Sequence, residues 1–214
     1  MFFIALIAGY VIGMFQTGYF IGKHYGIDIR EYGSKNAGMT NVNRTLGKLP
    51  ALVVFVLDVF KAILAFILVP TVLLGASWNF ATWTHVFNDE AMFHNIAPLL
   101  AGLGAVLGHN FPFYLKFRGG KGIASTLGII LMVDWQVALI AFAVGVVLVA
   151  SFKYISLASL AITLVWPVLL LIFGWSGEII ILAAAISALA WFMHRENISR
   201  LISGNERKFK LGKQ

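Results

Sequence analysis

The amino-acid sequence predicts an all-α polytopic membrane protein, and two features of the chain support this prediction. Of its 214 residues, 60% are hydrophobic and only 12% are charged. A soluble domain has about 45–50% apolar and about 25% charged residues. Apolar runs long enough to span a bilayer also recur along the chain. We therefore expect one integral-membrane domain over residues 1–214.

These apolar runs predict about seven transmembrane helices. The first run contains MFFIALIAGYVIGMF, which has no basic segment before it and no small-residue cleavage site after it. We therefore expect a retained helix and not a signal peptide. Polar segments or short turns separate each run from the next. The predicted spans are 1–22, 50–75, 93–107, 123–133, 136–151, 157–175 and 178–193.

The basic residues predict the orientation. Every Lys and Arg except Lys61 lies in 23–49, 108–122, 152–156 or 194–214, and the alternate loops carry acidic residues instead. Because basic loops favour the cytoplasmic side, we expect the N-terminus outside and the C-terminus in the cytoplasm. In a membrane protein, the net charge of +7 then reflects topology, and no nucleic-acid partner is expected.

The helices that flank the central glycine-rich segment, 108–122, are expected to be short. At the α-helical rise, only about 18 Å of helix fits between Lys121 and Asp134, which is less than the roughly 30 Å hydrocarbon core. The preceding span is little longer. We therefore expect 108–122 to dip below the cytoplasmic surface, where surrounding protein or a water-filled cavity satisfies irregular backbone.

The first polar segment, YGSKNAGMTNVNRTLGK at 32–48, is rich in hydrogen-bonding side chains. A glycine- and asparagine-rich turn with a helix cap would use the same residue types, because Asn and Ser readily bond their own backbone. So many donors beside basic residues favour a binding site instead. Its candidate residues are Ser34, Asn36, Thr40, Asn41, Asn43 and Arg44.

The second segment, GHNFPFYLKFRGGKGIAS at 108–125, has the features of an anion-binding loop. Its glycines leave backbone N–H groups open to a ligand, and a helix starting near Gly122 would direct its positive end to the same place. Lys121 adds a full charge. The loop is not a Walker A motif, because Lys121 is followed by Gly122 and not by Ser or Thr. A basic contact with lipid headgroups is the alternative.

The third segment, HRENISRLISGNERKF at 194–209, is predicted to be helical at its start. A helix would place His194, Asn197 and Leu201 on one face, with Glu196 and Arg200 nearby. A solvated, positively charged tail is the alternative, and His194 could equally be an interfacial histidine.

Asp58 and Lys61 are three residues apart in the second span and so share one helix face. Ionisable residues at membrane depth usually pair and face the protein interior, so we expect a structural ion pair that could support the first polar segment. On the opposite side, His85 and His94 lie near acidic residues. A metal site there is a less favoured alternative to exposed loop residues, and we expect no metal or other cofactor.

Together the three segments resemble the PlsY family of bacterial membrane glycerol-3-phosphate acyltransferases. The family's motifs read roughly GSGNxGATNxxR, GHxFPxxxxFKGGKGxAT and HRxNIxRLxxGxExK. The corresponding segments here are GSKNAGMTNVNR at 33–44, GHNFPFYLKFRGGKGIAS at 108–125 and HRENISRLISGNERK at 194–208. Order, spacing and the seven-span layout also match over the whole chain. One departure is Lys35, which stands where the family has glycine.

The resemblance implies transfer of a fatty acyl group from acyl phosphate to the 1-hydroxyl of sn-glycerol 3-phosphate, in the bacterial inner membrane with the site on the cytoplasmic side. The products would be lysophosphatidic acid and phosphate. The HxxxxD motif of the other glycerolipid acyltransferase class is absent. Membrane lipid surrounds such an enzyme, and an upstream enzyme that forms acyl phosphate is a possible partner.

The resemblance also suggests roles for individual residues. An acyl phosphate is already activated, so positioning and electrostatics can carry the reaction without an acyl-enzyme. We expect the loop Gly119, Gly120, Lys121 and Gly122 to bind the acyl phosphate, with Ser34 and Arg44 close by. His109, Asn197 and Thr40 would bind glycerol 3-phosphate. Further substrate-binding candidates are Asn36, Asn41, Ser125, His194 and Arg195.

Three questions stay open at this level. The general base could be His109, His194 or a phosphate oxygen of a substrate. Glu206 is expected to order the tail through Arg195 or Lys208. A transporter of an organic phosphate and a lipid-binding structural protein are the alternatives to an enzyme, although the chain shows no internal repeat and only one deep charged pair.

Overall fold

The computed structural model describes residues 2–74 and 92–210, with side chains from residue 96 onward in the second range, and these residues form helices without any strand. The outer-loop histidines, His85 and His94, lie outside the part whose side chains are described. The elements in chain order are α1 (Phe2–Gly13), α2 (Thr17–His24), η1 (Ile29–Glu31), α3 (Met39–Thr45), α4 (Lys48–Leu74), α5 (Met92–Asn110), η4 (Phe113–Leu115), α6 (Ile123–Val133), α7 (Trp135–Phe152), α8 (Ile155–Ile172), α9 (Gly177–Met193) and α10 (Arg195–Ile202).

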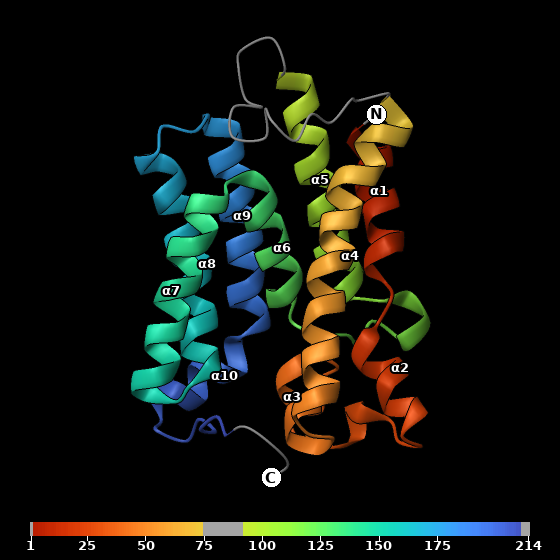
Figure 1. The fold of residues 1–214 in the computed structure, drawn as a ribbon, viewed down its shortest axis with the longest axis vertical. Helices are drawn as coiled ribbons and strands as arrows, with labels where there is room; N and C mark the ends of the chain where they lie inside the picture. The colour runs from red at the N-terminus through yellow and green to blue at the C-terminus, as the bar shows by residue number, and fades with distance from the viewer. Residues whose placement is uncertain (1, 75–91, 211–214) are drawn as a thin grey trace.

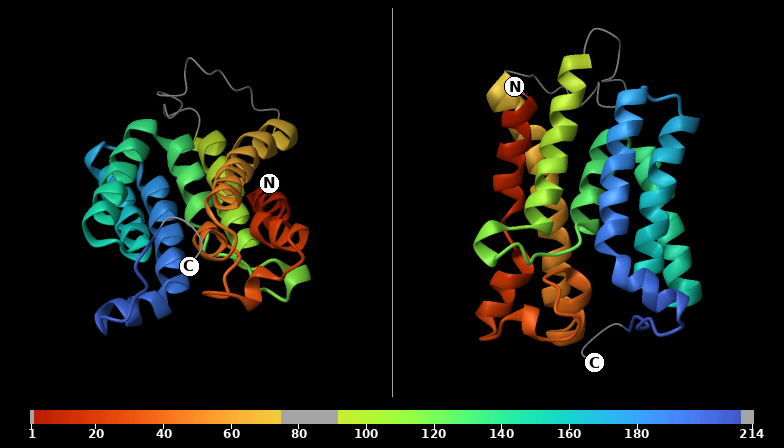
Figure 2. Two further views of the ribbon diagram at one scale, coloured as in Figure 1. Left: turned by 60° about the horizontal axis from the view of Figure 1, so that its bottom comes forward. Right: turned by 180° about the vertical axis from the view of Figure 1, so that it is seen from behind.

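The long helices form one bundle with α6 near its centre. Helices α1, α4 and α5 lie on one side, and α7, α8 and α9 lie on the other (Figure 1). The short helices α2, α3 and α10 gather at the end of the bundle opposite the N-terminus, as both views of Figure 2 also show. The first and third polar segments of the sequence are therefore brought to the same end of the molecule.

Each predicted span contains a helix, and five stretches are long and apolar enough to cross a membrane by length and composition. Helices α9 and α10 add a sixth only if this pair, bent by 62°, is counted as one span. Helix α6 is apolar but has only 11 residues, as expected. The five stretches are Phe2–His24, Lys48–Val72, Ile96–Leu115, Trp135–Phe152 and Ile155–Ile172.

Helix α5 is longer than the sequence predicted. It continues to Asn110 and has 19 residues, so only α6, of the two helices that flank the glycine-rich loop, is short. The extension is possible because carbonyls at the buried end of α5 find partners. The Gln16 amide donates to the carbonyl of His109 at 2.8 Å, and the Tyr10 hydroxyl donates to the carbonyl of Phe111 at 2.6 Å.

The segment after α5 lies deep, as predicted. Figure 2 (right) shows it crossing the bundle above the level of α2 and α3 before it enters α6. Leu115 and Gly120 in this segment are buried. Phe113, Tyr114 and the residues 116–118 are exposed, so surrounding protein covers only part of this irregular backbone, although such backbone at membrane depth needs protein or a water-filled cavity around it.

Glycines allow α1 and α5 to pack closely. A Cβ on Gly9 or Gly13 of α1 would collide with the backbone of α5, and a Cβ on Gly104 or Gly108 of α5 would collide with the backbone of α1. Small residues four apart are a common device for close packing of membrane helices. The contact brings the end of α5 against the joint between α1 and α2.

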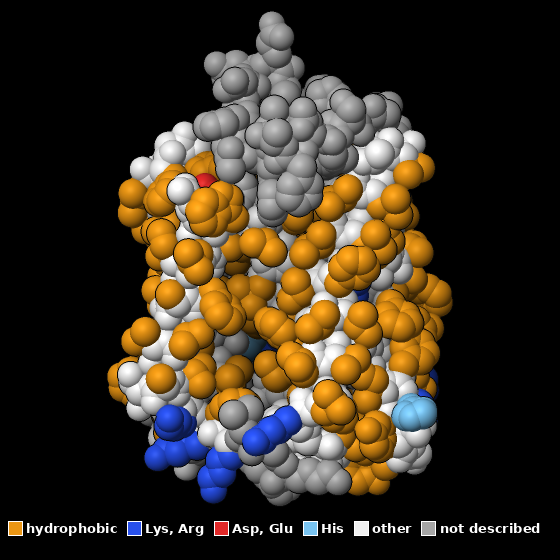
Figure 3. All heavy atoms as spheres, in the orientation of Figure 1, with side chains coloured by type: hydrophobic (Ala, Val, Ile, Leu, Met, Phe, Trp, Pro, Cys, Tyr) orange, Lys and Arg blue, Asp and Glu red, His pale blue; other side chains and the backbone are white. Residues whose placement is uncertain are grey.

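The surface separates into an apolar body and a basic end. Figure 3 shows hydrophobic side chains over the length of the helices, with Lys and Arg gathered near the C-terminal end of the bundle. This distribution agrees with the separation of charge along the sequence. Which end faces the cytoplasm stays a prediction from the positive-inside rule.

Candidate active site

The first polar segment is folded around the side chain of Asn41. Its amide nitrogen donates to the carbonyls of Ile29, Tyr32 and Asn36 at 2.9–3.0 Å, and its oxygen accepts from the backbone N–H of Ser34 at 2.7 Å. Asn41 is only 1% exposed. We therefore place Asn41 among the residues that shape the loop and not, as the sequence suggested, among those that contact substrate.

The loop around Asn41 contains a left-handed residue. Lys35 has φ 58°, a conformation that costs a residue with a Cβ roughly 1–2 kcal/mol. The related family motif has glycine at this position, and the backbone angle gives the physical reason.

The glycine-rich loop folds back on the end of α5. The N–H of Gly119 donates to the carbonyl of Asn110 at 3.2 Å, and the N–H of Gly120 donates to the carbonyl of His109 at 3.0 Å. These two amides therefore satisfy helix carbonyls and are not open to a ligand, which corrects the sequence-based expectation. Gly122, with φ 77°, directly precedes α6, whose first N–H groups lack intrahelical partners.

The three segments meet through side-chain contacts. The Asn36 amide donates to the carbonyl of Gly119 at 3.4 Å and accepts from the N–H of Gly38 at 3.0 Å. The ammonium group of Lys121 contacts the amide oxygen of Asn197 in α10. A side chain of the first segment thus contacts the backbone of the second segment, and side chains of the second and third segments contact each other.

Glu206 organises the third segment. Its carboxylate accepts from Asn197 at 2.8 Å, from the Arg200 guanidinium at 2.8 Å and from the Ser156 hydroxyl at 3.1 Å. Burial alone would raise the pKa of Glu206, but these hydrogen bonds lower it below the ordinary value. The expected partners, Arg195 and Lys208, were wrong: the ion pair is with Arg200.

We call Lys121, Arg44, Arg200, Arg207 and Glu206 the cationic cluster. Burial is the main cause that lowers the pKa of Lys121, to about 8, and the charges of Arg200 and Arg44 lower it further. Burial also lowers the pKa of Arg44, with contributions from Arg207 and Arg200, although an arginine stays charged at neutral pH. Four cationic groups therefore lie near two carboxylates, those of Glu206 and Glu196.

Arg44 has one nitrogen without a hydrogen-bond partner. Its Nε is buried and has no hydrogen-bond partner among the described residues. A buried donor without a partner destabilises the protein. An anion beside Arg44 would accept a hydrogen bond from Nε and would also reduce the repulsion between the cations of the cluster.

His194 is buried, and burial, with a further contribution from the charge of Lys121, lowers its pKa to about 4. Its Nδ1 is 2.8 Å from the carbonyl oxygen of Ala190. Because a carbonyl only accepts, Nδ1 carries the proton in this contact, and Nε2 of a neutral His194 retains a lone pair. His194 can therefore accept a proton through Nε2.

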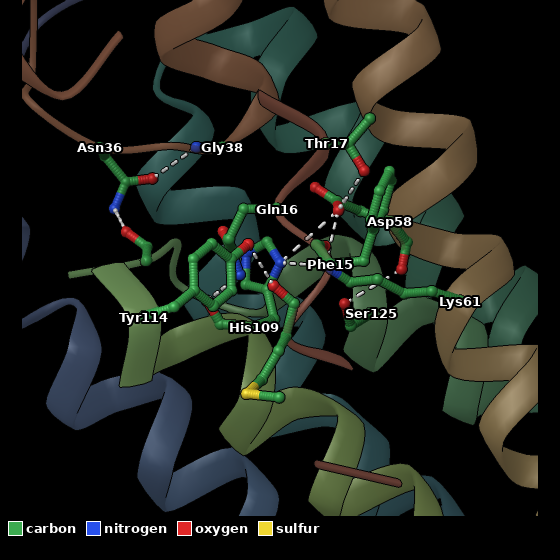
Figure 4. A network of polar contacts seen from close by, with 12 residues as sticks. Phe15, Gln16, Thr17, Asn36, Gly38, Asp58, Lys61, His109, Tyr114 and Ser125 are labelled. Carbon is green, nitrogen blue, oxygen red and sulfur yellow. Dashed lines mark hydrogen bonds and ion pairs between the residues drawn. The ribbon is translucent and has the colours of Figure 1, made fainter. Parts of the chain in front are cut away.

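His109 is held in a different place, at the inner end of the glycine-rich loop. Its Nδ1 is 2.8 Å from Nζ of Lys61 and 3.6 Å from a carboxylate oxygen of Asp58. Lys61 and Asp58 form the predicted ion pair at 2.8 Å. Figure 4 shows the imidazole facing Asp58 and Lys61 beside Gln16. With 3% exposure, His109 is a buried residue.

The other predicted site residues differ in their burial and contacts. The Ser125 hydroxyl is fully buried and donates to the carbonyl of Asp58 at 3.0 Å, so Ser125 joins α6 to α4 and does not face a substrate. Arg195 is exposed and folds back over the Phe192 ring at 4.6 Å. Ser34 is exposed and Thr40 is half-buried, and both belong to the first segment.

Sequence reasoning missed residues that the tertiary structure brings in. Gln16 and Thr17 lie in the first predicted span, yet Thr17 donates to Asp58 at 3.1 Å and Gln16 binds the end of α5. Ser156 lies just before the predicted sixth span, in the first turn of α8, and donates to Glu206. Polar residues at the ends of apolar runs were the only available signal. Among the described residues, no group of three His, Cys, Asp or Glu side chains is placed to hold a metal ion.

The fold and the site define a class of protein: a polytopic membrane protein with a cationic cluster at one end of its helical bundle. A family model described as glycerol-3-phosphate acyltransferase matches residues 3–204. The chain belongs to the glycerol-3-phosphate acyltransferase family and is an acyltransferase, which favours an enzyme over the transporter and the structural protein.

Relatives and solved structures agree with this assignment. A glycerol-3-phosphate acyltransferase of Thermoanaerobacter sp. (strain X514) is 40% identical over 203 residues, covering 94% of this chain and 92% of the relative. That of Aquifex aeolicus (strain VF5) is 35% identical over 204 residues, covering 95% and 97%. A crystal structure of PlsY, an integral membrane glycerol 3-phosphate acyltransferase in its glycerol 3-phosphate form, is 33% identical with a TM-score of 0.82, covering 98% of this chain and 96% of that chain.

A second crystal structure of PlsY, in its lysophosphatidic acid form, has a TM-score of 0.80 and the same 33% identity, covering 98% of this chain and 95% of that chain. The protein described here is thus a multi-pass membrane protein with the fold of PlsY.

Proposed function

We propose that this protein transfers a fatty acyl group from acyl phosphate to the 1-hydroxyl of sn-glycerol 3-phosphate, with lysophosphatidic acid and phosphate as products. The hydroxyl oxygen attacks the acyl carbonyl carbon, and the bond from that carbon to the phosphate oxygen breaks. Phosphate leaves with the electron pair, and the hydroxyl proton passes to a base. No acyl-enzyme intermediate is needed.

The cationic cluster is the observation that carries this proposal. Both proposed substrates contain a phosphate, and the four cationic groups of the cluster outnumber the two carboxylates near them, Glu206 and Glu196, while the Nε of Arg44 is unpaired among the described residues. It lies at the end of an apolar bundle, where a substrate with a long acyl chain can keep that chain in lipid. The related crystal structures of PlsY in its glycerol 3-phosphate and lysophosphatidic acid forms support the proposed acceptor and product.

Acyl phosphate is the proposed donor because the chain lacks the usual means of activating a weaker one. It has no cysteine and no HxxxxD motif. An acyl phosphate has a good leaving group, so charge stabilisation and alignment account for the work left to the protein.

We assign Lys121, Arg44 and the start of α6 to the acyl phosphate, with Ser34 at the edge of this region. Lys121 is the central cation, because it contacts Asn197 and because the charges of Arg44 and Arg200 lower its pKa. Asn197 and Thr40 are assigned to glycerol 3-phosphate. Asn36 and Glu206 hold the loops that carry these groups.

Two groups can accept the hydroxyl proton. One is Nε2 of His194, whose Nδ1 is occupied by the Ala190 carbonyl. The other is a phosphate oxygen of a substrate. Replacing His194 with Asn preserves a donor near the Nδ1 position but removes the basic nitrogen, so kcat should fall sharply only if His194 is the base.

We place the enzyme in the bacterial inner membrane, with the cationic cluster on the cytoplasmic side, because the basic loops lie at that end of the bundle. An enzyme that forms acyl phosphate must then supply the donor. No metal or cofactor is included in this proposal.

The test uses purified protein in lipid nanodiscs with acyl phosphate and glycerol 3-phosphate, and follows both phosphate release and the lipid product. We expect both products in equal amounts, and no turnover with acyl-CoA or acyl carrier protein. Efficient turnover with acyl-CoA alone would refute the donor. Accumulation of glycerol 3-phosphate in vesicles without any acylated product would support the transporter instead.

A further inference from the structure

The deep ion pair of Asp58 and Lys61 reaches the glycine-rich loop through one residue, His109. Nζ of Lys61 has three neighbours at 2.8 Å: a carboxylate oxygen of Asp58, the carbonyl oxygen of Phe15 and Nδ1 of His109. Two of these atoms can only accept hydrogen bonds. Figure 4 shows the contact between Lys61 and His109; Nδ1, the third atom, can donate or accept, depending on where the protons lie.

Charge and basicity decide where the protons lie. A neutral lysine beside an ionised Asp58 and a neutral imidazole would leave an uncompensated buried carboxylate, which is costly. A neutral lysine beside an imidazolium would balance the charge, but an amine in water binds a proton about four pKa units more tightly than an imidazole does. The favoured state therefore has a charged Lys61, an ionised Asp58 and a neutral His109.

A charged lysine has three N–H donors, and here they meet three acceptors. Phe15 and Asp58 take two of them, so Nδ1 of His109 accepts the third. A neutral imidazole whose Nδ1 accepts carries its proton on Nε2. The ion pair at membrane depth thus fixes the tautomer of a histidine at the end of α5.

The protonated nitrogen faces the loop. A Cβ built on Gly120 would collide with Nε2 of His109, so the edge of the ring that carries the proton lies directly against the backbone of Gly120. Nε2 has no hydrogen-bond partner among the described residues. The unpaired donor therefore lies against Gly120, next to the segment that leads into Lys121.

We propose that Asp58 and Lys61 are positioning residues that hold His109 in its Nε2–H tautomer, and that this N–H donates a hydrogen bond to a phosphoryl oxygen bound over the loop. His109 is then a fixed donor and not the general base, because one nitrogen is occupied by Lys61 and the other is protonated. The identity of the acceptor rests on the proposed function, whereas the tautomer does not.

The tautomer can be measured directly on the wild-type protein. In protein labelled with ¹⁵N-histidine, in lipid nanodiscs, protonated and unprotonated ring nitrogens differ in chemical shift, and couplings to the ring protons identify each nitrogen. His109 is assigned as the signal lost in His109→Gln. We expect a neutral ring with the proton on Nε2 at neutral pH. A proton on Nδ1, or an imidazolium, overturns the proposal whatever reaction the enzyme catalyses.

Two variants with amide side chains distinguish the roles of Nε2 and Nδ1 of His109. The Gln amide places a donor near the Nε2 position, whereas the Asn amide reaches only the Nδ1 position. We expect His109→Gln to keep kcat/KM about tenfold or more above that of His109→Asn, with the loss expressed in the KM for acyl phosphate, since a hydrogen bond to a charged group is worth about this factor or more. Equal losses in both variants would refute the donor role.

The ion pair is tested by the double variant Asp58→Asn with Lys61→Met, which removes both charges together. We expect the His109 ring to show a mixture of tautomers and the KM for acyl phosphate to rise, while the KM for glycerol 3-phosphate changes less. Thr163→Val is the matched control, because this buried hydroxyl bonds only to carbonyls of its own helix. An unchanged tautomer in a folded double variant would show that the ion pair does not set it.

Discussion

The side chain of Lys121 contacts the amide oxygen of Asn197, and so joins the glycine-rich loop to the helix that follows the last span. The two residues are 76 positions apart in the chain. Asn197 in turn donates to Glu206 at 2.8 Å, and Glu206 binds Arg200. The charge of Lys121 is thereby fixed in position by a chain of hydrogen bonds within the third segment.

Replacing Lys121 with Ala should lower kcat/KM for acyl phosphate by about tenfold to over a hundredfold, because it removes a charge-assisted contact of about 1.5–3 kcal/mol. Steady-state kinetics with each substrate varied separately would measure this. Arg118→Ala is the control, since Arg118 lies in the same loop but is exposed. A similar loss in Arg118→Ala would mean that general loop charge, and not Lys121, binds the substrate.

Lys121 and Asn197 should be energetically coupled. Because Asn197 holds Lys121, the double variant Lys121→Ala with Asn197→Ala should lose less transition-state stabilisation than the two single variants added together, by about 0.5–3 kcal/mol. The measurement is a double-mutant cycle on kcat/KM. Strict additivity would indicate that the contact is not maintained during turnover.

The pH dependence of acyl-phosphate binding should report the pKa of Lys121. Its pKa is lowered to about 8, mainly by burial, so the side chain is charged below this pH and loses its proton above it. Burial of the Lys121 ammonium therefore destabilises the folded protein fully below about pH 8. The destabilisation declines as the pH rises from about 8 toward 10.5, the ordinary pKa of lysine. A bound phosphate favours the charged form.

We accordingly expect kcat/KM for acyl phosphate to be level just below about pH 8 and to fall above it, by up to about tenfold per pH unit. Lys121→Arg should move this fall to higher pH, because arginine stays charged. A profile that is the same in the wild-type enzyme and in Lys121→Arg would assign the inflection to another group.

Gly120→Ala should impair folding as well as binding. Its Cβ would collide with the imidazole of His109, and overpacking a buried site costs about 1–3 kcal/mol. The melting temperature in detergent should fall, whereas the control Gly177→Ala, where nothing lies within 4 Å of the new Cβ, should melt near the wild-type temperature. Adding His109→Ala should relieve part of the loss; if it does not, the collision is not the cause.

Lys35→Gly should stabilise the protein. Lys35 is exposed and has φ 58°, so glycine removes a strain of roughly 1–2 kcal/mol at the expense of about 0.4–1 kcal/mol of additional unfolded-state entropy. The expected net gain is of order 0.5–1 kcal/mol, measurable as a higher melting temperature. Lys35→Ala keeps the Cβ and should give no such gain. A loss of stability in Lys35→Gly would contradict the strain.

Single cysteines can test the orientation, because the chain has none of its own. Gln136 and Ser203 are both exposed; Gln136 is in the first turn of α7 and Ser203 directly follows α10, and the start of α7 and α10 lie at opposite ends of the bundle (Figure 1). In intact cells, an impermeant thiol reagent should label Gln136→Cys and should reach Ser203→Cys only after lysis. The opposite pattern would reverse the predicted topology.

The sequence by itself determined the class of fold and the three segments of the site. Hydrophobic runs long enough for a bilayer leave a chain few options other than membrane helices, because lipid offers no partner for exposed backbone groups. The polar segments stand out against these runs, so Lys121, Arg44, His194 and Asn197 could be chosen from the sequence as candidates. The spacing of Asp58 and Lys61 on one helix face also predicted their ion pair.

The tertiary structure alone decided what each polar group does, because a side chain's partners depend on elements far away in the sequence. The amides of Gly119 and Gly120 donate to carbonyls at the end of α5, and the side chains of Asn41 and Ser125 donate to backbone carbonyls inside the protein. Glu206 meets Arg200 and not its other candidate partners. His109 is drawn to Lys61, 48 positions away, because a buried ion pair needs every hydrogen bond satisfied, and no local pattern in the sequence records that requirement.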